Sequence, residues 1–149
     1  MQPNLRSAVV ESLRRRVNLT EYRAIRQLWI AHSLAEDAHD IPGLMATLTE
    51  DCVYTVVNTG TSWRGKAGAT QFYQQLLTAF PDIDFDLQNI VIGPQGVFEE
   101  AFVHGTYQAQ WLDLPSPSGQ HIEFAVTILF PWDPKQRLFT GERVYFFLR

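Results

Sequence analysis

Residues 97–112 read VFEEAFVHGTYQAQWL, and their side chains alternate in character with a period of two. This alternation is typical of a β-strand with one buried face, because successive side chains of a strand point to opposite faces. The odd face is mostly apolar, with Val97, Ala101, Val103, Gly105, Tyr107, Ala109 and Trp111. The even face is mixed, with Phe98, Glu100, Phe102, His104, Thr106, Gln108 and Gln110. The pattern predicts one long strand whose odd face covers the core.

The segments on both sides of this strand repeat the same period. Alternating patterns predict strands over 83–91, 122–132 and 138–148, separated by turns at 93–96 and 133–136. A shorter strand is expected over 52–58, followed by a loop over 60–65. A run of long strands joined by short turns favours an antiparallel sheet.

The N-terminal third is predicted to be helical. Helices are expected over 5–16, from Asn18 to about residue 37, over 41–48, and over 69–80 before Pro81. Asn18 and Glu21 have the spacing of a capping box. We therefore predict an α+β fold in which N-terminal helices pack on a strongly curved antiparallel sheet and enclose a pocket. Gly105 marks a site where such a sheet bends.

Composition and charge exclude several classes of protein. The chain has 149 residues, 46% of them apolar, and a net charge of -4, which predicts a single domain over 1–149. A single cysteine, Cys52, excludes an intramolecular disulfide framework and a multi-cysteine metal site. No apolar run is long enough to span a bilayer. We expect a cytoplasmic protein that does not bind a membrane.

Charge is unevenly distributed along the chain. Residues 1–30 contain six arginines against Glu11 and Glu21, so that segment carries +4 and the remainder -8. Residues 1–18 are expected to form a basic helical extension. Because no aromatic residues are interleaved with the run Arg14, Arg15 and Arg16 and the rest of the chain is acidic, we expect a solvated basic face and no nucleic-acid partner.

Several short strings, in order, resemble a known family. They are 48–54 (LTEDCVY), 63–66 (WRGK), 79–82 (AFPD), 104–107 (HGTY), 111–115 (WLDLP) and 141–146 (GERVYF). Together with the order of helices and strands, they resemble the nuclear transport factor 2 superfamily and, within it, the SnoaL-like polyketide cyclases. The resemblance implies a cone-shaped fold with a conical pocket for a small hydrophobic, oxygen-bearing molecule, used without a cofactor. It also implies a homodimer formed through the outer sheet face, to which Phe98 and Phe102 belong.

The catalytic residues of relatives transfer only in part. The Asp of SnoaL-type cyclases aligns with Ile128, and the water-activating network of limonene-epoxide hydrolases aligns with Ala101, Val103 and Val144. Tyr54 resembles the pocket tyrosine of the epoxide hydrolases. Tyr107 stands where cyclase relatives commonly have a histidine.

The candidate catalytic residues are Glu142, Tyr54 and Tyr107. By the resemblance, Glu142 shares the inward face of the last strand and would move a proton next to a carbonyl, which the two tyrosines would orient or polarise. The ligand-binding candidates are Trp63, Trp111, Phe146, Val56, Val103 and Ile128. Two alternatives remain open for Glu142, namely a structural ion pair with Arg143 or Arg64, and an outward orientation. The tyrosines could equally be half-buried packing residues.

Two histidines are further candidates. His32 belongs to an apolar stripe and precedes Glu36 by four residues, but a metal site needs a third ligand that no spacing identifies, so no metal is expected. We expect the segment with His32, Asp37 and His39 to be a solvated helix end or pocket rim. His104 would act as a base only if a bulge reversed the strand phase. The expected function is cyclase or isomerase chemistry, and the alternatives are a non-catalytic binding or accessory protein and an epoxide hydrolase with a non-standard site.

Overall fold

The structure is a computed structural model, and it describes residues 5–148. Six strands within these residues form one sheet. The helices are α1 (Leu5–Leu13), α2 (Leu19–Asp37), α3 (Ile41–Met45) and α4 (Gly65–Ala79). The strands are β1 (Leu48–Val56), β2 (Thr61–Arg64), β3 (Asp84–Gly93), β4 (Gly96–Thr106), β5 (His121–Asp133) and β6 (Leu138–Leu148). Across the sheet, neighbouring strands follow the order β2-β1-β6-β5-β4-β3.

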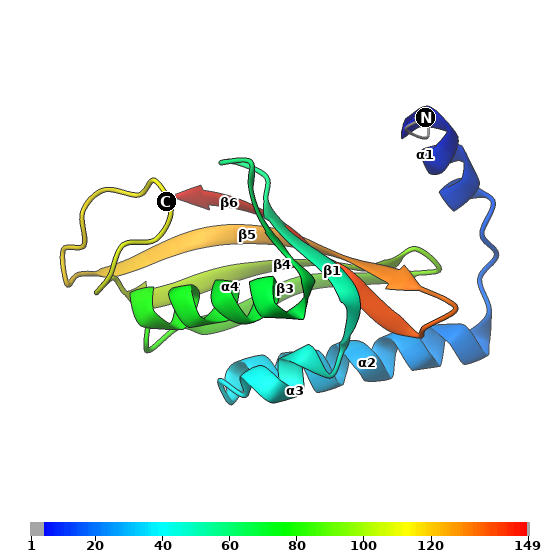
Figure 1. The fold of residues 1–149 in the computed structure, drawn as a ribbon, viewed down its shortest axis with the longest axis horizontal. Helices are drawn as coiled ribbons and strands as arrows, with labels where there is room; N and C mark the ends of the chain where they lie inside the picture. The colour runs from blue at the N-terminus through cyan, green and yellow to red at the C-terminus, as the bar shows by residue number, and fades with distance from the viewer. Residues whose placement is uncertain (1–4, 149) are drawn as a thin grey trace.

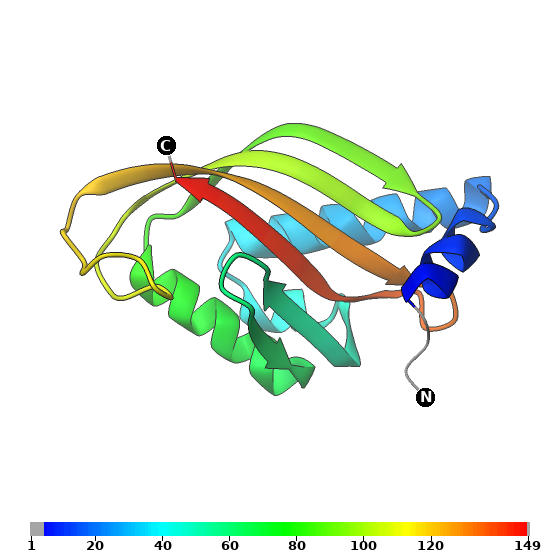
Figure 2. The same cartoon turned by 90° about the horizontal axis from the view of Figure 1, so that it is seen from above.

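The helices α2 and α4 lie on the same face of the sheet (Figures 1 and 2). Helix α4 packs on β1 and β2, and α2 packs on β3 and β4. The side chain of Asn18 accepts a hydrogen bond from the backbone N–H of Glu21, as predicted, whereas the Glu21 carboxylate accepts from Trp132 Nε1 instead of closing the capping box. Asp40 caps α3 by accepting from the backbone N–H of Gly43. This α+β arrangement confirms the predicted fold class. The space between the two helices and the sheet contains the core.

One strand pair is parallel, contrary to the antiparallel sheet that was predicted. Strands β1 and β6 run in the same direction, and Tyr54 pairs with Glu142 across them. The other neighbouring pairs, such as β4 with β5, are antiparallel. The period-two pattern of a strand carries no information on the direction of its neighbour, which is why the sequence did not reveal this pair.

Other boundaries also differ from the prediction. Residues 61–64, expected in a loop, form β2, which is too short to show a period of its own. The strand predicted over 97–112 ends at Thr106, whose partner His121 begins β5. Beyond it the backbone N–H of Tyr107 donates to Gln120, and that of Gln108 to Ala79. The alternation of apolar and polar residues in 97–112 therefore extends beyond Thr106, the last residue of β4 that is paired with another strand. Helices α1 and α3 are shorter than expected.

The two faces of β4 have the predicted orientation. Val97, Ala101 and Val103 are buried, whereas Phe98 is 44% exposed on the outer face. The β4–β5 register runs without a shift, so no bulge reverses the phase at His104. His104 lies on the outer face, with Nδ1 3.1 Å from Oε2 of Glu123.

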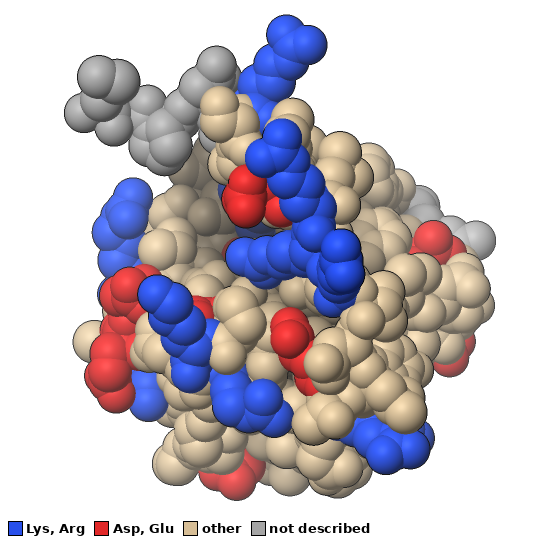
Figure 3. Space-filling view, turned by 90° about the vertical axis from the view of Figure 1, so that its right-hand side faces the viewer, with Lys and Arg blue, Asp and Glu red and all other residues tan. Residues whose placement is uncertain are grey.

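The predicted basic extension projects from one end of the molecule. Arg14, Arg15 and Arg16 are exposed, and Figure 3 shows lysine and arginine side chains gathered at this end. The segment is tied to the β3–β4 turn, because Arg15 Nη1 donates to the Pro94 carbonyl and Gln95 Nε2 donates to the Ser12 carbonyl. Residues 1–4 of the predicted extension lie outside the described residues. No helix within the described range has the length and apolar character needed to cross a membrane.

Candidate active site

Glu142 lies on the concave side of β6 and is 2% exposed. Its position depends on Gly141, which has φ 128° and lies so close to β1 that any Cβ there would collide with the Val53 backbone. This close approach brings β6 against β1 and directs the next side chain inward. Arg143 then points to the opposite face and is exposed. The structure thus shows Glu142 facing inward and not paired with Arg143.

A chain of buried hydrogen bonds ends on one oxygen of Glu142. Tyr73 Oη donates to Glu142 Oε1 at 2.9 Å, and His32 Nε2 lies 2.9 Å from the same oxygen. Tyr54 Oη is 2.9 Å from Tyr73 Oη. Since the proton of Tyr73 goes to the carboxylate, Tyr54 is the donor in the tyrosine pair. Four elements, α2, α4, β1 and β6, each contribute one of these side chains.

The proton on the far side of His32 is fixed by Thr47. Thr47 Oγ1 donates to the Leu44 carbonyl at 2.7 Å, so it can only accept from His32 Nδ1, 2.8 Å away. Nδ1 therefore carries a hydrogen in every protonation state of the ring. His32 therefore connects Thr47 to Glu142 through its two ring nitrogens.

Both tyrosines are held neutral. Burial, followed by the nearby Glu142 carboxylate, raises the pKa of Tyr54 and of Tyr73 well above the ordinary value of 10. Each hydroxyl therefore remains a donor near neutral pH.

Glu36 is a second carboxyl group of this site, one helical turn after His32 on α2. Burial, then the charges of Glu142, Glu99 and Asp37, raise the pKa of Glu36 well above its usual range. One ligand atom from each of His32, Glu36 and Glu142 lies within 4.8 Å of the others, so the three could hold a metal ion.

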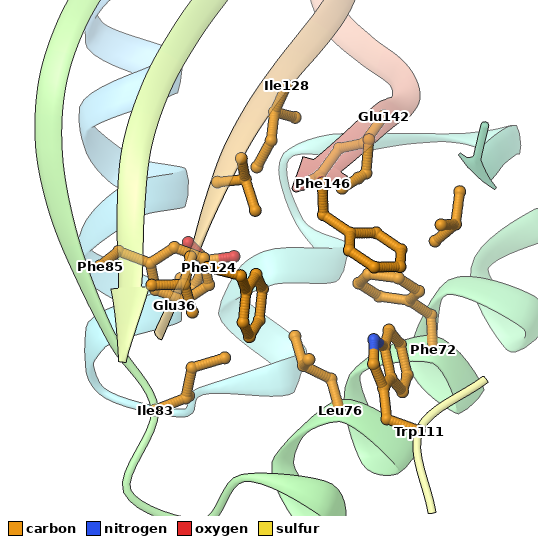
Figure 4. A pocket seen from close by; sticks show the side chains of 14 residues that line it. Glu36, Phe72, Leu76, Ile83, Phe85, Trp111, Phe124, Ile128, Glu142 and Phe146 are labelled. Atoms are coloured by element: carbon orange, nitrogen blue, oxygen red, sulfur yellow. The ribbon is translucent and has the colours of Figure 1, made fainter. Parts of the chain in front are cut away.

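An apolar cavity of about 40 Å³ opens beside these acids. Figure 4 shows Glu36 and Glu142 entering from different walls, with the rings of Phe72, Phe124, Phe146 and Trp111 around the space. The indole nitrogen of Trp111 is turned toward this space. The arrangement combines an apolar wall, a hydrogen-bond donor and a buried pair of an imidazole and a carboxyl group.

Most of the predicted binding residues line this apolar cavity. They are Val56, Val103, Trp111, Ile128 and Phe146, together with Glu142. Trp63 is not among the lining residues and instead stacks on Trp111, with ring centroids 6.2 Å apart. Tyr54 lies behind the cavity in the hydrogen-bond chain. Tyr107 lies elsewhere, stacked on Phe80, where its hydroxyl accepts from the backbone N–H of Trp111.

Three residues of the site were missed or misplaced from the sequence. His32, expected at a solvated helix end or pocket rim, is 1% exposed, and Glu142 supplies the third partner that its spacing with Glu36 could not identify. Tyr73 was absorbed into the apolar stripe of its helix. Glu99 occupies an odd, inward position of β4 and is 6% exposed, and its phase in 97–112 was the signal that could have found it.

Comparisons with known proteins agree with this fold. A family model described as the SnoaL-like domain matches residues 29–133. A crystal structure of a candidate SnoaL-like polyketide cyclase from Shewanella denitrificans OS-217 has a TM-score of 0.71 at 17% identity, covering 83% of this chain and 90% of that one. A candidate polyketide cyclase from Xanthomonas campestris pv. campestris gives 0.67 at 23% identity, with 84% and 91% covered.

A third solved structure, an NTF2-like protein of unknown function from Burkholderia pseudomallei K96243, gives a TM-score of 0.69 at 12% identity, with 83% and 91% covered. No curated protein matches the sequence. At these identities the solved structures establish the fold, and the function has to be argued from the site.

Proposed function

Because the chain belongs to the SnoaL-like domain family, we propose that it binds a small, mainly apolar, oxygen-bearing molecule in the apolar cavity and moves a proton on it. The observation that carries the proposal is the buried contact of 2.9 Å between His32 Nε2 and Glu142 Oε1 beside that cavity. A cyclase or isomerase reaction without a cofactor is the chemistry that such a pair serves.

In the proposed reaction, Glu142 removes a proton from a carbon next to a carbonyl group. His32 shares the charge that changes on Glu142, and Thr47 holds its ring in the required tautomer. Trp111 Nε1 faces the cavity and is the donor for the substrate oxygen. Tyr73 and Tyr54 act through Glu142 as positioning residues, because their hydroxyls are used in the hydrogen-bond chain.

The proposal can be tested without knowing the natural substrate. The exchange of α-hydrogens of 2-tetralone for deuterium in heavy water measures proton transfer directly by NMR. Wild-type protein should accelerate exchange, and Glu142→Gln should lower the rate by about 100-fold or more while ligand-observed NMR still detects binding. Glu100→Gln removes a carboxylate from the outer face and should leave exchange unchanged. Equal exchange by wild type and Glu142→Gln would refute the proposed role of Glu142.

A non-catalytic binding role is the second candidate. It is favoured by Ile128, which lines the apolar cavity at the position that aligns with the catalytic Asp of SnoaL-type cyclases. Binding of the ketone by wild-type protein with no acceleration of exchange would support it. The epoxide hydrolase alternative is weaker, since the aligned positions Ala101, Val103 and Val144 are buried and apolar.

We also propose that two copies pair through the outer sheet face. Phe98 is 44% exposed and Val91 63% exposed on adjacent strands. Phe147 on β6 is 57% exposed, and its partner Ala125 on β5 pairs with Phe102 on β4. These side chains continue across the sheet and supply the apolar centre that a dimer interface needs.

A further inference from the structure

A second cavity, of about 180 Å³, adjoins the apolar one and has a different character. We propose that it is a subsite for an organic ammonium group, so that the ligand is an apolar molecule carrying a basic amine. This inference rests on the proposed function, because the two cavities share Glu36 and Phe85. We name the second space the acidic cavity, and its lining residues are Trp29, His32, Ser33, Glu36, Asp37, Phe85, Leu87, Glu99, Ala101 and Phe130.

Carboxyl groups outnumber cations in the acidic cavity. Glu36, Asp37 and Glu99 line it, and among its described lining residues there is no lysine or arginine. The one group that can carry positive charge is His32, and its two ring nitrogens already face Thr47 and Glu142. Among the described lining residues, no cation is therefore available to pair with these three carboxyl groups, and a bound ammonium would supply that partner.

Aromatic rings form other walls of the acidic cavity. Trp29, Phe85 and Phe130 all line it. Trp29 is held in place because its Nε1 donates to Glu99 Oε2 at 3.0 Å, and Phe130 packs against the His32 ring, with centroids 5.2 Å apart. Carboxylates combined with aromatic faces suit an alkylammonium, which is attracted to the ring faces as well as to the charges. A small metal ion would use the carboxylates but gain nothing from the rings.

Glu36 connects the two cavities and orients the ligand. Its carboxyl group lines both, and none of the hydrogen bonds found among the described residues involves it. An ammonium in the acidic cavity can therefore bind Glu36 while the apolar body of the same molecule lies against Phe124 and Phe146. The carbonyl and the basic group would then sit at opposite ends of the ligand.

Proton release would accompany binding of a cation. Burial, followed by the charge of Glu142, raises the pKa of Glu99 to about 7. The pKa of Glu36 is raised by the same two causes. The charged groups that face these two carboxyls are Asp37, Glu142 and His32. A bound ammonium favours the ionised carboxylates, so protons held in the empty site leave when it binds.

The test compares three probes with similar carbon skeletons. Calorimetry would measure the affinity of 2-phenylethylamine, of uncharged 2-phenylethanol and of anionic 3-phenylpropanoate, in two buffers that differ in ionisation enthalpy. We expect the amine to bind at least about tenfold more tightly than the alcohol and to release protons on binding. Glu36→Gln and Glu99→Gln should each reduce this preference to about twofold or less. Glu100→Gln, next to Glu99 but on the outer face, should retain it.

The proposal is overturned if the alcohol or the carboxylate binds as tightly as the amine. It is also overturned if Zn²⁺ or Mg²⁺ binds with one-to-one stoichiometry while the amine shows no preference. The comparison of the three probes on wild-type protein needs no variant, so it decides the matter even if a substitution unfolds the protein. If the protein accelerates the hydrogen exchange of 2-tetralone but does not prefer the amine, the ammonium subsite is overturned and the proposed function stands. If no probe binds and no exchange occurs, the proposed function fails too.

Discussion

His32 Nε2 and Glu142 Oε1 lie 2.9 Å apart, although the two residues are separated by 110 positions in the sequence. The pair is excluded from solvent, and each member has further partners that fix its orientation. Such a buried pair costs free energy to desolvate, and it is therefore weak evidence for a stabilising role. Its place beside an apolar cavity is the reason for assigning it a chemical one.

Thr47 should be needed to hold His32, whereas its neighbour Thr49 should not. Thr47→Val removes the acceptor of His32 Nδ1–H and should lower the free energy of unfolding by about 1–3 kcal/mol. Nitrogen NMR of the imidazole should also show that the single tautomer is lost. Thr49 is equally buried, but its hydroxyl has no partner among the described residues. Thr49→Val should be neutral or stabilising, and equal losses in both variants would contradict this assignment.

Glu99 should make stability depend on pH. Burial and Glu142 raise the pKa of Glu99 from an ordinary value of 4.5 to about 7. Between these values the folded protein holds a proton that the unfolded chain has lost, so the free energy of unfolding falls as pH rises through this range. As the pH rises from about 4.5 to about 8, the free energy of unfolding of Glu99→Gln should therefore increase relative to that of wild type by up to about 3 kcal/mol. Urea unfolding at both pH values measures it, and a difference independent of pH would refute the shift.

Removing Tyr73 should cost more than removing Tyr54. Tyr73→Phe deletes the donor to Glu142 and leaves the Tyr54 hydroxyl without its acceptor, whereas Tyr54→Phe removes only one hydrogen bond. In chemical denaturation, we expect the free energy of unfolding to fall by about 2–3 kcal/mol for Tyr73→Phe and by about 1 kcal/mol for Tyr54→Phe. The ketone exchange rate should fall more in Tyr73→Phe as well. A larger effect from Tyr54→Phe would reverse the donor order inferred for the tyrosine pair.

The proposed dimer should depend on the outer sheet face. Phe98→Asp places a charge among the exposed apolar side chains of that face and should convert the dimer to monomer in sedimentation experiments. Leu34, 64% exposed on α2, provides the control, since Leu34→Asp changes an equally apolar position away from the sheet. If Phe98→Asp leaves the mass of the assembly unchanged, the interface lies elsewhere.

The sequence was sufficient for the fold class and for part of the site. Period-two alternation placed Phe98 outward and Val103 inward, and the resemblance placed Glu142 on the inward face of the last strand. The pairing of Glu142 with His32 was not accessible, because it depends on β6 lying parallel to β1 and on the distance between β6 and α2. Such tertiary distances leave no periodic trace in a single sequence. The position of Tyr107 was mispredicted for a related reason. Strand β4 ends one residue before it, because Thr106 pairs with His121, the first residue of β5.

A double-mutant cycle on the ketone exchange rate tests the central claim most directly. His32→Gln, Glu142→Gln and the double variant would each be compared with wild type under identical conditions. If the two residues transfer the proton as one unit, the double variant should be about as slow as the slower single variant. Losses that simply multiply would show that His32 and Glu142 act independently, and they would contradict the proposed mechanism.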